Sequence, residues 1–137
     1  KRIADPVNAI KGYDLPVSAF TGYEDGTMDN GGTAYEKRGI ANYVPEWIDD
    51  NCIQCNQCAF ACPHAVIRPF LLTEEEMAKA PEGMRTKKAQ GKGLEGLAYR
   101  IQVSTLDCTG CGVCVEVCPA KTKALVMKPL ASQKKLH

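Results

Sequence analysis

Eight cysteines fall into two runs with identical spacing, and this feature limits the possible folds more than any other. The first run is Cys52, Cys55, Cys58 and Cys62, and the second is Cys108, Cys111, Cys114 and Cys118. Both runs read C-x2-C-x2-C-x3-C and both are followed directly by proline, Pro63 or Pro119. The second run is the first displaced by 56 residues, so the chain contains an internal repeat.

Three kinds of chemistry use cysteines at this density. A disulfide framework would need four cysteines within eleven residues to close tight and strained loops, twice over. A structural zinc site usually combines two C-x2-C pairs that are separated by a longer loop. The run C-x2-C-x2-C-x3-C-P is instead the signature of bacterial two-cluster ferredoxins, which hold [4Fe–4S] clusters on thiolates. We therefore predict two [4Fe–4S] clusters rather than disulfides or zinc.

The pattern of two-cluster ferredoxins also indicates which cysteines bind together, because there the fourth cysteine of each run binds the other cluster. On that pattern one cluster would be held by Cys52, Cys55, Cys58 and Cys118, and the other by Cys108, Cys111, Cys114 and Cys62. Ligands exchanged in this way would join the two halves. We therefore expect the chain to be poorly folded without its clusters.

Short segments with β character flank both runs. They are 46–49 and 65–69 around the first run, and 99–103 and 124–129 around the second. Segment 99–103 alternates in hydrophobicity at the period of a strand. We predict two hairpins, each with a cluster loop and a helical turn inside it, related by a pseudo-twofold axis. The fold class is thus α+β, a bacterial two-cluster ferredoxin-like fold.

An insertion at about residues 70–98 separates the two halves. Thr73 and Glu76 have the spacing of a capping box, which predicts a helix from Thr73 to about Ala80 that stops at Pro81. The segment 85–93 is basic and rich in glycine. It is either a docking site for an acidic partner or a mobile, solvated loop, and we favour the loop.

The first 45 residues differ from the rest of the chain. They carry six glycines, three prolines and several turn signals, with no clear helical or strand period. We expect an irregular N-terminal arm over 1–45 that packs on other domains, followed by a two-cluster domain over 46–137. The chain begins with lysine rather than methionine, and we expect it to be a piece of a longer protein.

Composition excludes several other functions. The chain has 137 residues with 17 Lys and Arg against 16 Asp and Glu, a formal net charge of +1, which gives no basis for a nucleic-acid partner. No apolar run approaches the roughly 18 residues that a membrane span needs. No nucleophile–base constellation is present, so no catalytic residue is assigned.

Two residues near the first run have open roles. Trp47 is expected to pack near the run, and His64 is expected to be a spectator. Electron transfer by Trp47 and tuning of a cluster by His64 stay open as alternatives.

Three segments outside the cysteine runs resemble a known family. Pro16–Phe20, Asp25–Thr27 and Tyr35–Ala41, which contains Glu36, Lys37 and Arg38, resemble the "EKR" region of pyruvate:ferredoxin (flavodoxin) oxidoreductases. In that family this region directly precedes a two-cluster ferredoxin domain with a long insertion, so the resemblance covers essentially the whole chain.

The resemblance implies a role inside a large cytoplasmic enzyme of anaerobic metabolism. Such an enzyme converts pyruvate and coenzyme A to acetyl-CoA and carbon dioxide on thiamine diphosphate, which lies in other domains. Its electrons leave through [4Fe–4S] clusters to ferredoxin or flavodoxin. This chain would then be an electron relay whose partners are the other domains and the external carrier. Two alternatives stay open: a free-standing two-cluster ferredoxin with an N-terminal extension, and a structural zinc module.

Overall fold

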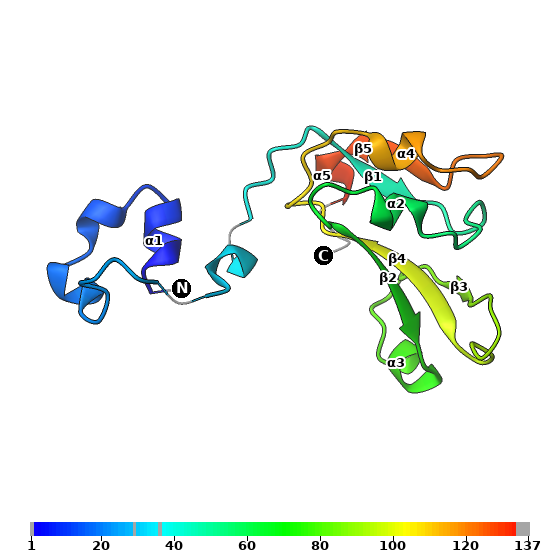
Figure 1. Ribbon diagram of the computed structural model, residues 1–137, viewed down its shortest axis with the longest axis horizontal. Coiled ribbons are helices and arrows are strands. Elements are labelled where there is room, and N and C mark those ends of the chain that lie inside the picture. Colours follow the sequence, from blue (N-terminus) through cyan, green and yellow to red (C-terminus); the bar gives the residue numbers. More distant parts are fainter. Residues whose placement is uncertain (1, 29, 36, 134–137) are drawn as a thin grey trace. The chain divides into compact units, whose positions relative to one another are not determined.

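The computed structural model describes residues 2–28, 30–35 and 37–133 and divides the chain into two units, Lys1–Arg38 and Gly39–His137 (Figure 1). Glu36, part of the expected EKR region, lies outside the described residues. Helices and strands both occur, so the fold is α+β as predicted. Within the described ranges, no helix has the length and apolar character needed to cross a bilayer.

The first unit consists of short helical turns. They are α1 (Ala4–Asn8), η1 (Gly12–Asp14), η2 (Val17–Phe20) and η3 (Gly32–Tyr35). One turn lies at Gly26, where the Asp25 carboxylate accepts hydrogen bonds from the backbone N–H and the hydroxyl of Thr27 at 3.0 and 2.7 Å. Ala19 is the one buried side chain in the described part of this unit. That part therefore has no hydrophobic core of its own.

The second unit contains two antiparallel sheets and four short helices among its described residues. Its elements are β1 (Tyr43–Trp47), α2 (Gln57–Phe60), β2 (Ile67–Leu72), α3 (Glu74–Ala78), β3 (Lys87–Lys88), β4 (Ala98–Val103), α4 (Val113–Glu116), β5 (Leu125–Pro129) and α5 (Leu130–Gln133). One sheet pairs β1 with β5, and the other has the order β2-β4-β3. Helices α2 and α4 lie within the two cysteine runs, as expected.

Each main strand pair joins the two halves of the repeat. In β1 and β5, Trp47 lies opposite Leu125, and in β2 and β4, Ile67 lies opposite Val103. The predicted hairpin around each cysteine run is therefore wrong, because the strand before one run pairs with the strand after the other. Hydrophobic periodicity located the strands, but it does not specify partners, which depend on long-range packing.

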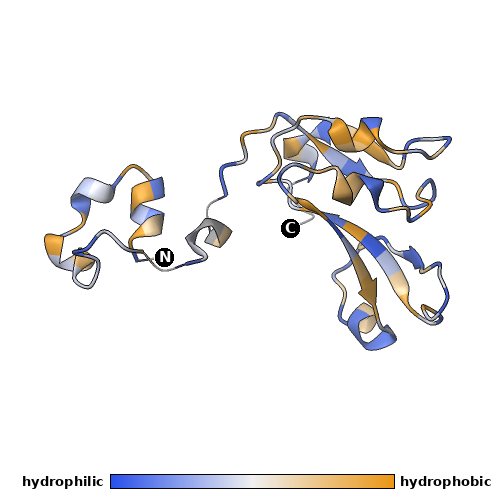
Figure 2. Cartoon of the chain, viewed as in Figure 1, coloured by the Kyte–Doolittle hydropathy of each residue, from blue (hydrophilic) through white to orange (hydrophobic). Residues whose placement is uncertain are grey.

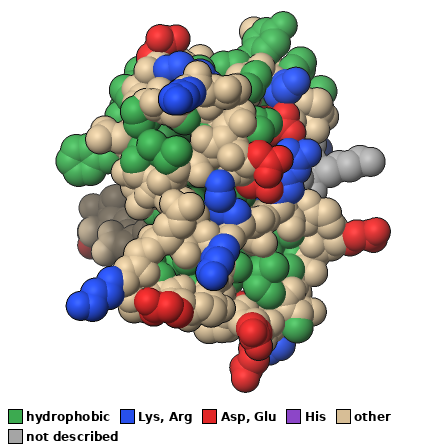
Figure 3. All heavy atoms as spheres, turned by 90° about the vertical axis from the view of Figure 1, so that its right-hand side faces the viewer, with side chains coloured by type: hydrophobic (Ala, Val, Ile, Leu, Met, Phe, Trp, Pro, Cys, Tyr) green, Lys and Arg blue, Asp and Glu red, His purple; other side chains and the backbone are tan. Residues whose placement is uncertain are grey.

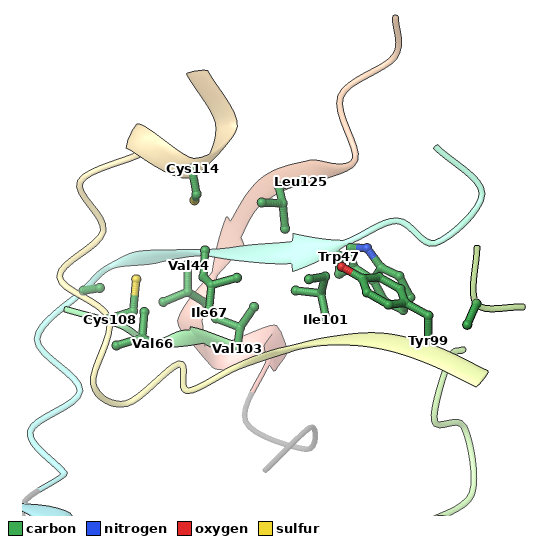
Figure 4. Close-up of a cluster of buried hydrophobic side chains, with 12 residues drawn as sticks. Val44, Trp47, Val66, Ile67, Tyr99, Ile101, Val103, Cys108, Cys114 and Leu125 are labelled. Carbon is green, nitrogen blue, oxygen red and sulfur yellow. The ribbon is translucent and has the colours of Figure 1, made fainter. Parts of the chain in front are cut away.

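The hydrophobic core lies between these two strand pairs (Figure 4). Its most buried side chains are Val44, Leu125, Ile101 and Ile67, each at most 3% exposed. Along β4, Tyr99, Ile101 and Val103 are buried and alternate with half-buried residues, which confirms the period-two prediction. Figure 2 shows β2, α2 and α4 coloured mostly as hydrophobic residues, so the loop helices contribute apolar surface near the cysteines.

The segment between β2 and β4 begins with the predicted capping box. The hydroxyl of Thr73 accepts a hydrogen bond from the Glu76 backbone N–H at 3.3 Å, and the Glu76 carboxylate accepts one from the Thr73 N–H at 2.8 Å. Helix α3 ends at Ala78 rather than at Ala80. The reason is that the N–H groups of Lys79 and Ala80 bond to carbonyls three residues back, which closes the last turn tightly before Pro81.

Candidate iron–sulfur sites

The two cysteine loops have the same backbone course. In the first loop Gln54 and Asn56 adopt φ values of 59° and 60°, and α2 begins directly afterwards. In the second loop Gly110 and Gly112 adopt φ values of 74° and 77°, and α4 begins directly afterwards. These positions are related by the 56-residue displacement of the repeat. The left-handed conformation costs glycine little but is strained for glutamine, so the first loop needs support that the second does not.

Equivalent backbone N–H groups point at equivalent sulfur atoms. The N–H of Gln54 donates to Sγ of Cys52 at 3.4 Å, and the N–H of Gly110 donates to Sγ of Cys108 at 3.3 Å. A third such contact, from Ala124 N–H to Sγ of Cys118 at 3.5 Å, has no such counterpart at Cys62 in the described chain. Hydrogen bonds of this kind stabilise negative charge on sulfur, as thiolate ligands require.

The cysteines line two separate hollows. The first hollow is lined by Cys52, Cys55, Cys58 and Cys118, together with residues that include Trp47, Ile53, Asn56, Tyr99 and Leu125. The second is lined by Cys108, Cys111, Cys114 and Cys62, together with residues that include Pro45, His64, Val66, Ile67 and Met127. Each hollow thus brings together three cysteines of one run and the last cysteine of the other.

The sulfur environment differs within each set. Cys55 and Cys111 are exposed, whereas Cys108 and Cys114 are buried. Burial raises the pKa of the Cys58 thiol to about 11 and that of Cys114 to about 12, and it raises the pKa of Cys108 as well. Without a cationic group in the hollow these thiols keep their protons, so iron binding has to displace them. In the described chain no three His, Cys, Asp or Glu side chains are placed to hold one single metal ion.

Trp47 and Tyr99 form the apolar wall of the first hollow. Their rings meet edge to face, with centroids 6.2 Å apart, and lie side by side in Figure 4. The expectation that Trp47 packs near the first run is confirmed. Sequence reasoning missed Tyr99, whose hydroxyl donates a 2.6 Å hydrogen bond to Oδ1 of Asn56 in the first loop. Burial holds the pKa of Tyr99 well above its usual range, so this hydroxyl stays a donor.

The segment 85–93 is bound to the first loop rather than free in solvent. The ammonium group of Lys87 donates to the backbone carbonyls of Asp49 and Cys52, both at 2.7 Å. The amide side chain of Gln54 donates to the Lys88 carbonyl at 2.7 Å and accepts from the Gln90 N–H at 2.9 Å. Our preference for a mobile, solvated loop is therefore wrong for 87–90. Local sequence gave no signal for these contacts, which join residues 34 to 38 positions apart.

A second lysine binds the end of the second run. The ammonium group of Lys123 donates to the carbonyls of Glu116 and Cys118 at 3.0 and 2.9 Å. Lys123 is half-buried, like Lys87.

His64 lies at the second hollow, where it lines the wall next to Cys62, and its side chain is exposed. The spectator role predicted for His64 stays a prediction.

The surface of the second unit carries charges of both signs. On the face shown in Figure 3, Lys and Arg side chains are interspersed with Asp, Glu and hydrophobic side chains. Among the large hydrophobic side chains that are exposed, Phe60 of α2 and Ile53 of the first loop lie within the first cysteine run, at 94% and 54% exposed. The mixed charge gives no patch of one sign on this face that would attract a polyanion.

Comparison with known proteins agrees with this geometry. Residues 51–121 match the family described as "4Fe-4S double cluster binding domain", and residues 1–41 match the EKR family, described as a domain of unknown function. The chain is 58% identical over 130 residues to "Pyruvate:ferredoxin oxidoreductase" of Moorella thermoacetica and 57% identical over 133 residues to "Pyruvate-flavodoxin oxidoreductase" of Enterobacter agglomerans. These alignments cover 95% and 97% of this chain but 11% of each relative.

A relative of another type shares the same region. The chain is 52% identical over 118 residues to the mitochondrial "Pyruvate dehydrogenase [NADP(+)]" of Euglena gracilis, an alignment that covers 86% of this chain and 6% of that protein. The chain therefore spans about a tenth or less of the length of these relatives. The matched region is one that oxidoreductases acting on pyruvate, with different named electron acceptors, have in common.

Proposed function

The chain belongs to the family of 4Fe-4S double cluster binding domains, and we propose that it is the electron-relay domain of a pyruvate oxidoreductase. One observation carries this proposal: eight cysteines surround two hollows, four to each, in a chain whose relatives oxidise pyruvate. The relay connects a thiamine diphosphate site in the rest of the enzyme with external ferredoxin or flavodoxin. A cytoplasmic location is part of the same proposal.

The proposed ligand sets follow the two hollows. Cys52, Cys55, Cys58 and Cys118 hold cluster I, and Cys108, Cys111, Cys114 and Cys62 hold cluster II. A bound [4Fe–4S] cluster takes up and releases one electron at a time, which is the chemistry that a relay needs. The donor set fits, because four thiolates are available at each hollow and backbone N–H groups already point at Cys52 and Cys108.

The protein's own contribution is position and shielding. Apolar side chains such as Leu125 at the first hollow and Ile67 at the second exclude water from the cysteines. The exposed Cys55 and Cys111 leave one side of each hollow open to a partner. With clusters bound, these exposed sides would be the places where a redox partner approaches, while the buried sides of both hollows belong to one hydrophobic core.

We further propose that the two halves are related by a pseudo-twofold axis. The equivalent φ values and N–H to sulfur contacts, which are displaced by 56 residues, support it. The strand pairings support it as well, because the pair of Trp47 with Leu125 corresponds to the pair of Val103 with Ile67. On this proposal 46–137 is a two-cluster ferredoxin-like domain with an insertion at about 70–98. Residues 1–45 form an arm that packs on other domains of the enzyme. The match of 1–41 to the EKR family favours this arrangement over a free-standing ferredoxin.

The proposal is tested by analysing iron, acid-labile sulfide and zinc in anaerobically purified protein. We expect about eight iron and eight sulfide per chain. Two zinc ions without sulfide would instead establish the structural zinc module. Pyruvate with coenzyme A should leave the isolated 137 residues oxidised, and should reduce both clusters when the chain is part of its full oxidoreductase. Turnover by the isolated chain would refute a relay without a catalytic site.

A further inference from the structure

Two lysine ammonium groups are fixed on the backbone of cysteines that line the same hollow. Lys87 donates to the carbonyl of Cys52, and Lys123 donates to the carbonyl of Cys118. Each lysine also binds a second carbonyl, that of Asp49 or Glu116, at 2.7 and 3.0 Å. Two hydrogen bonds hold each positive charge in place, so neither charge is averaged over a freely rotating side chain.

Both lysines contact cysteines of the first hollow, and the second hollow has no similar contact. In the described part of the chain, no lysine donates a hydrogen bond to Cys62, Cys108, Cys111 or Cys114 or to their backbone. Neither hollow has a lysine or arginine in its lining, so the difference between them lies in the hydrogen bonds that Lys87 and Lys123 donate to the carbonyls of Cys52 and Cys118. The arrangement is therefore an asymmetry between two sites that are otherwise built alike.

The sequence explains why the repeat is asymmetric here. Lys87 comes from the segment between β2 and β4, which occurs once in the chain. Lys123 comes from the connection between Cys118 and β5, which is two residues longer than the connection between Cys62 and β2. Neither lysine thus has a counterpart in the other half.

Among the described residues, no carboxylate forms an ion pair with Lys87 or Lys123. The nearby Asp49 carboxylate is paired with Arg85 instead, at 3.8 Å. Reduction adds one negative charge to a cluster, and a fixed positive charge close to its ligands stabilises the reduced form. Both lysines are half-buried, so solvent and salt screen them less than they screen a surface charge.

We propose that Lys87 and Lys123 act as positioning charges that raise the midpoint potential of cluster I and leave that of cluster II nearly unchanged. The inference rests on the proposed function, since it requires a cluster at each hollow. It goes beyond that function because it states which cluster has its midpoint potential raised and which residues raise it. The segment that separates the two halves thereby acquires a redox role as well as a structural one.

The test is a redox titration with dithionite of the anaerobically purified, cluster-loaded protein, followed by electron paramagnetic resonance. Lys87→Gln and Lys123→Gln keep a hydrogen-bond donor and remove the charge. Lys87→Arg and Lys123→Arg keep the charge. Lys88→Gln and Lys121→Gln are matched controls, because each removes one exposed neighbouring charge. The signals are assigned to cluster I or II with Cys55→Ser and Cys111→Ser, which alter one cluster each.

We expect each Lys→Gln variant to lower the ratio of reduced to oxidised cluster I about tenfold at fixed potential, which is a shift of about 59 mV to a more negative midpoint. The double variant should shift further, and the Lys→Arg variants and controls should stay close to the parent protein. Cluster II should not move in any of them. If one Gln variant loses cluster I, the other still decides the outcome, because the two lysines lie on different segments.

Equal shifts in both clusters, or none in either, would overturn the inference. Those results are distinguishable from a failure of the proposed function, which would appear as protein without iron and sulfide before any titration. A merely structural role of the lysines would change the stability and the cluster content of the Gln variants while leaving the midpoint of the remaining cluster I in place.

Discussion

The hydroxyl of Tyr99 on β4 donates a 2.6 Å hydrogen bond to Oδ1 of Asn56, a residue held at φ 60° in the first cysteine loop. Tyr99 thus supports a strained backbone position from 43 residues away. We expect Tyr99→Phe to keep the ring packing and to lower stability by about 1 kcal/mol. Thermal unfolding under anaerobic conditions, with the loss of visible absorbance as the readout, measures this change.

A matched control for this prediction is Asn56→Gly. Glycine removes the same hydrogen bond but relieves the left-handed strain, as glycine does at Gly112 in the second loop. Because Asn56→Gly alone would leave the buried Tyr99 hydroxyl without its acceptor, the substitution is made in the Tyr99→Phe background, where we expect it to restore part of the lost stability. A double variant that is no more stable than Tyr99→Phe would show that the hydrogen bond does not act by supporting this conformation.

The exchange of the last cysteines between the two sites is tested by Cys118→Ala. Because Cys118 lines the hollow of Cys52, Cys55 and Cys58, we expect the variant to damage cluster I and to spare cluster II. Cys62→Ala should do the reverse. Electron paramagnetic resonance of the two reduced clusters separates these outcomes, and damage to the cluster of the same run would refute the exchanged ligand sets.

Leu125 links core packing to the first hollow. Its side chain is 1% exposed, lies opposite Trp47 in the β1–β5 pair and lines the wall next to the cysteines. We expect Leu125→Ala to cost about 3 kcal/mol, because it leaves a cavity in a packed core. Val126→Ala on the opposite face of the same strand, 40% exposed, should cost about 0.5 kcal/mol or less. Denaturant unfolding of the cluster-loaded protein compares the two variants.

The side chain of Gln54 connects the first loop to the segment 88–90 by two hydrogen bonds. We expect Gln54→Ala to speed hydrogen exchange at the Gln90 amide about fivefold, since the variant removes the acceptor of that N–H and a local bond worth about 1 kcal/mol. Gln90→Ala keeps the backbone donor and should leave exchange close to that of the parent protein. Similar rates in both variants would show that strand β3, rather than Gln54, holds this segment.

Removal of the clusters should unfold the second unit. Burial raises the pKa of Cys58 to about 11 and of Cys114 to about 12 from 9.0. In a folded cluster-free chain, alkylation at pH 8 would therefore be about a hundredfold slower at Cys58, and about a thousandfold slower at Cys114, than at ordinary thiols. We expect all eight cysteines to react at one rate after iron chelation. Persistent protection of Cys58 and Cys114 would show that the fold survives without clusters.

The same shifts set the direction of a pH effect. A thiol whose pKa is raised by folding stabilises the folded state at every pH below its unfolded pKa of 9.0. For Cys58 this contribution is lost as the pH rises from 9.0 towards the folded pKa of about 11. Any folded cluster-free protein should therefore lose stability between about pH 9 and 11. Denaturant unfolding at increasing pH, followed by circular dichroism, measures this loss in protein that stays folded, and a constant free energy of unfolding over the range would contradict it.

Sequence patterns predicted the local features of this fold well. Period-two hydrophobicity located the strand at 99–103, and Thr73 with Glu76 located the start of α3, because both signals come from neighbouring residues. The pairing of β1 with β5 was not predictable in this way, since any strand could pair with several partners. The ferredoxin pattern of the cysteines predicted ligands exchanged between the halves, but we did not extend that exchange to the strands and predicted one hairpin around each run instead.

The contacts of Lys87, Gln54 and Tyr99 were missed for a different reason. Each reaches a loop more than 30 residues away, and no local pattern distinguishes such a lysine or glutamine from a solvated one. One signal was available within the repeat. Gln54 and Asn56 stand where the second run has Gly110 and Gly112, so their unusual conformation, and the need for outside support, could have been inferred by comparing the runs.

The pairing of β1 with β5 also sets an order for biosynthesis. Leu125 leaves the ribosome 78 residues after Trp47, its partner across the strands, and at 5–20 residues per second this takes roughly 4 to 16 seconds. For most of that interval, until Cys118 has emerged, the nascent chain displays Cys52, Cys55 and Cys58 without the cysteine that completes their hollow. The site encoded first is finished last, so the cell has to keep three thiols reduced and available until translation has passed Cys118.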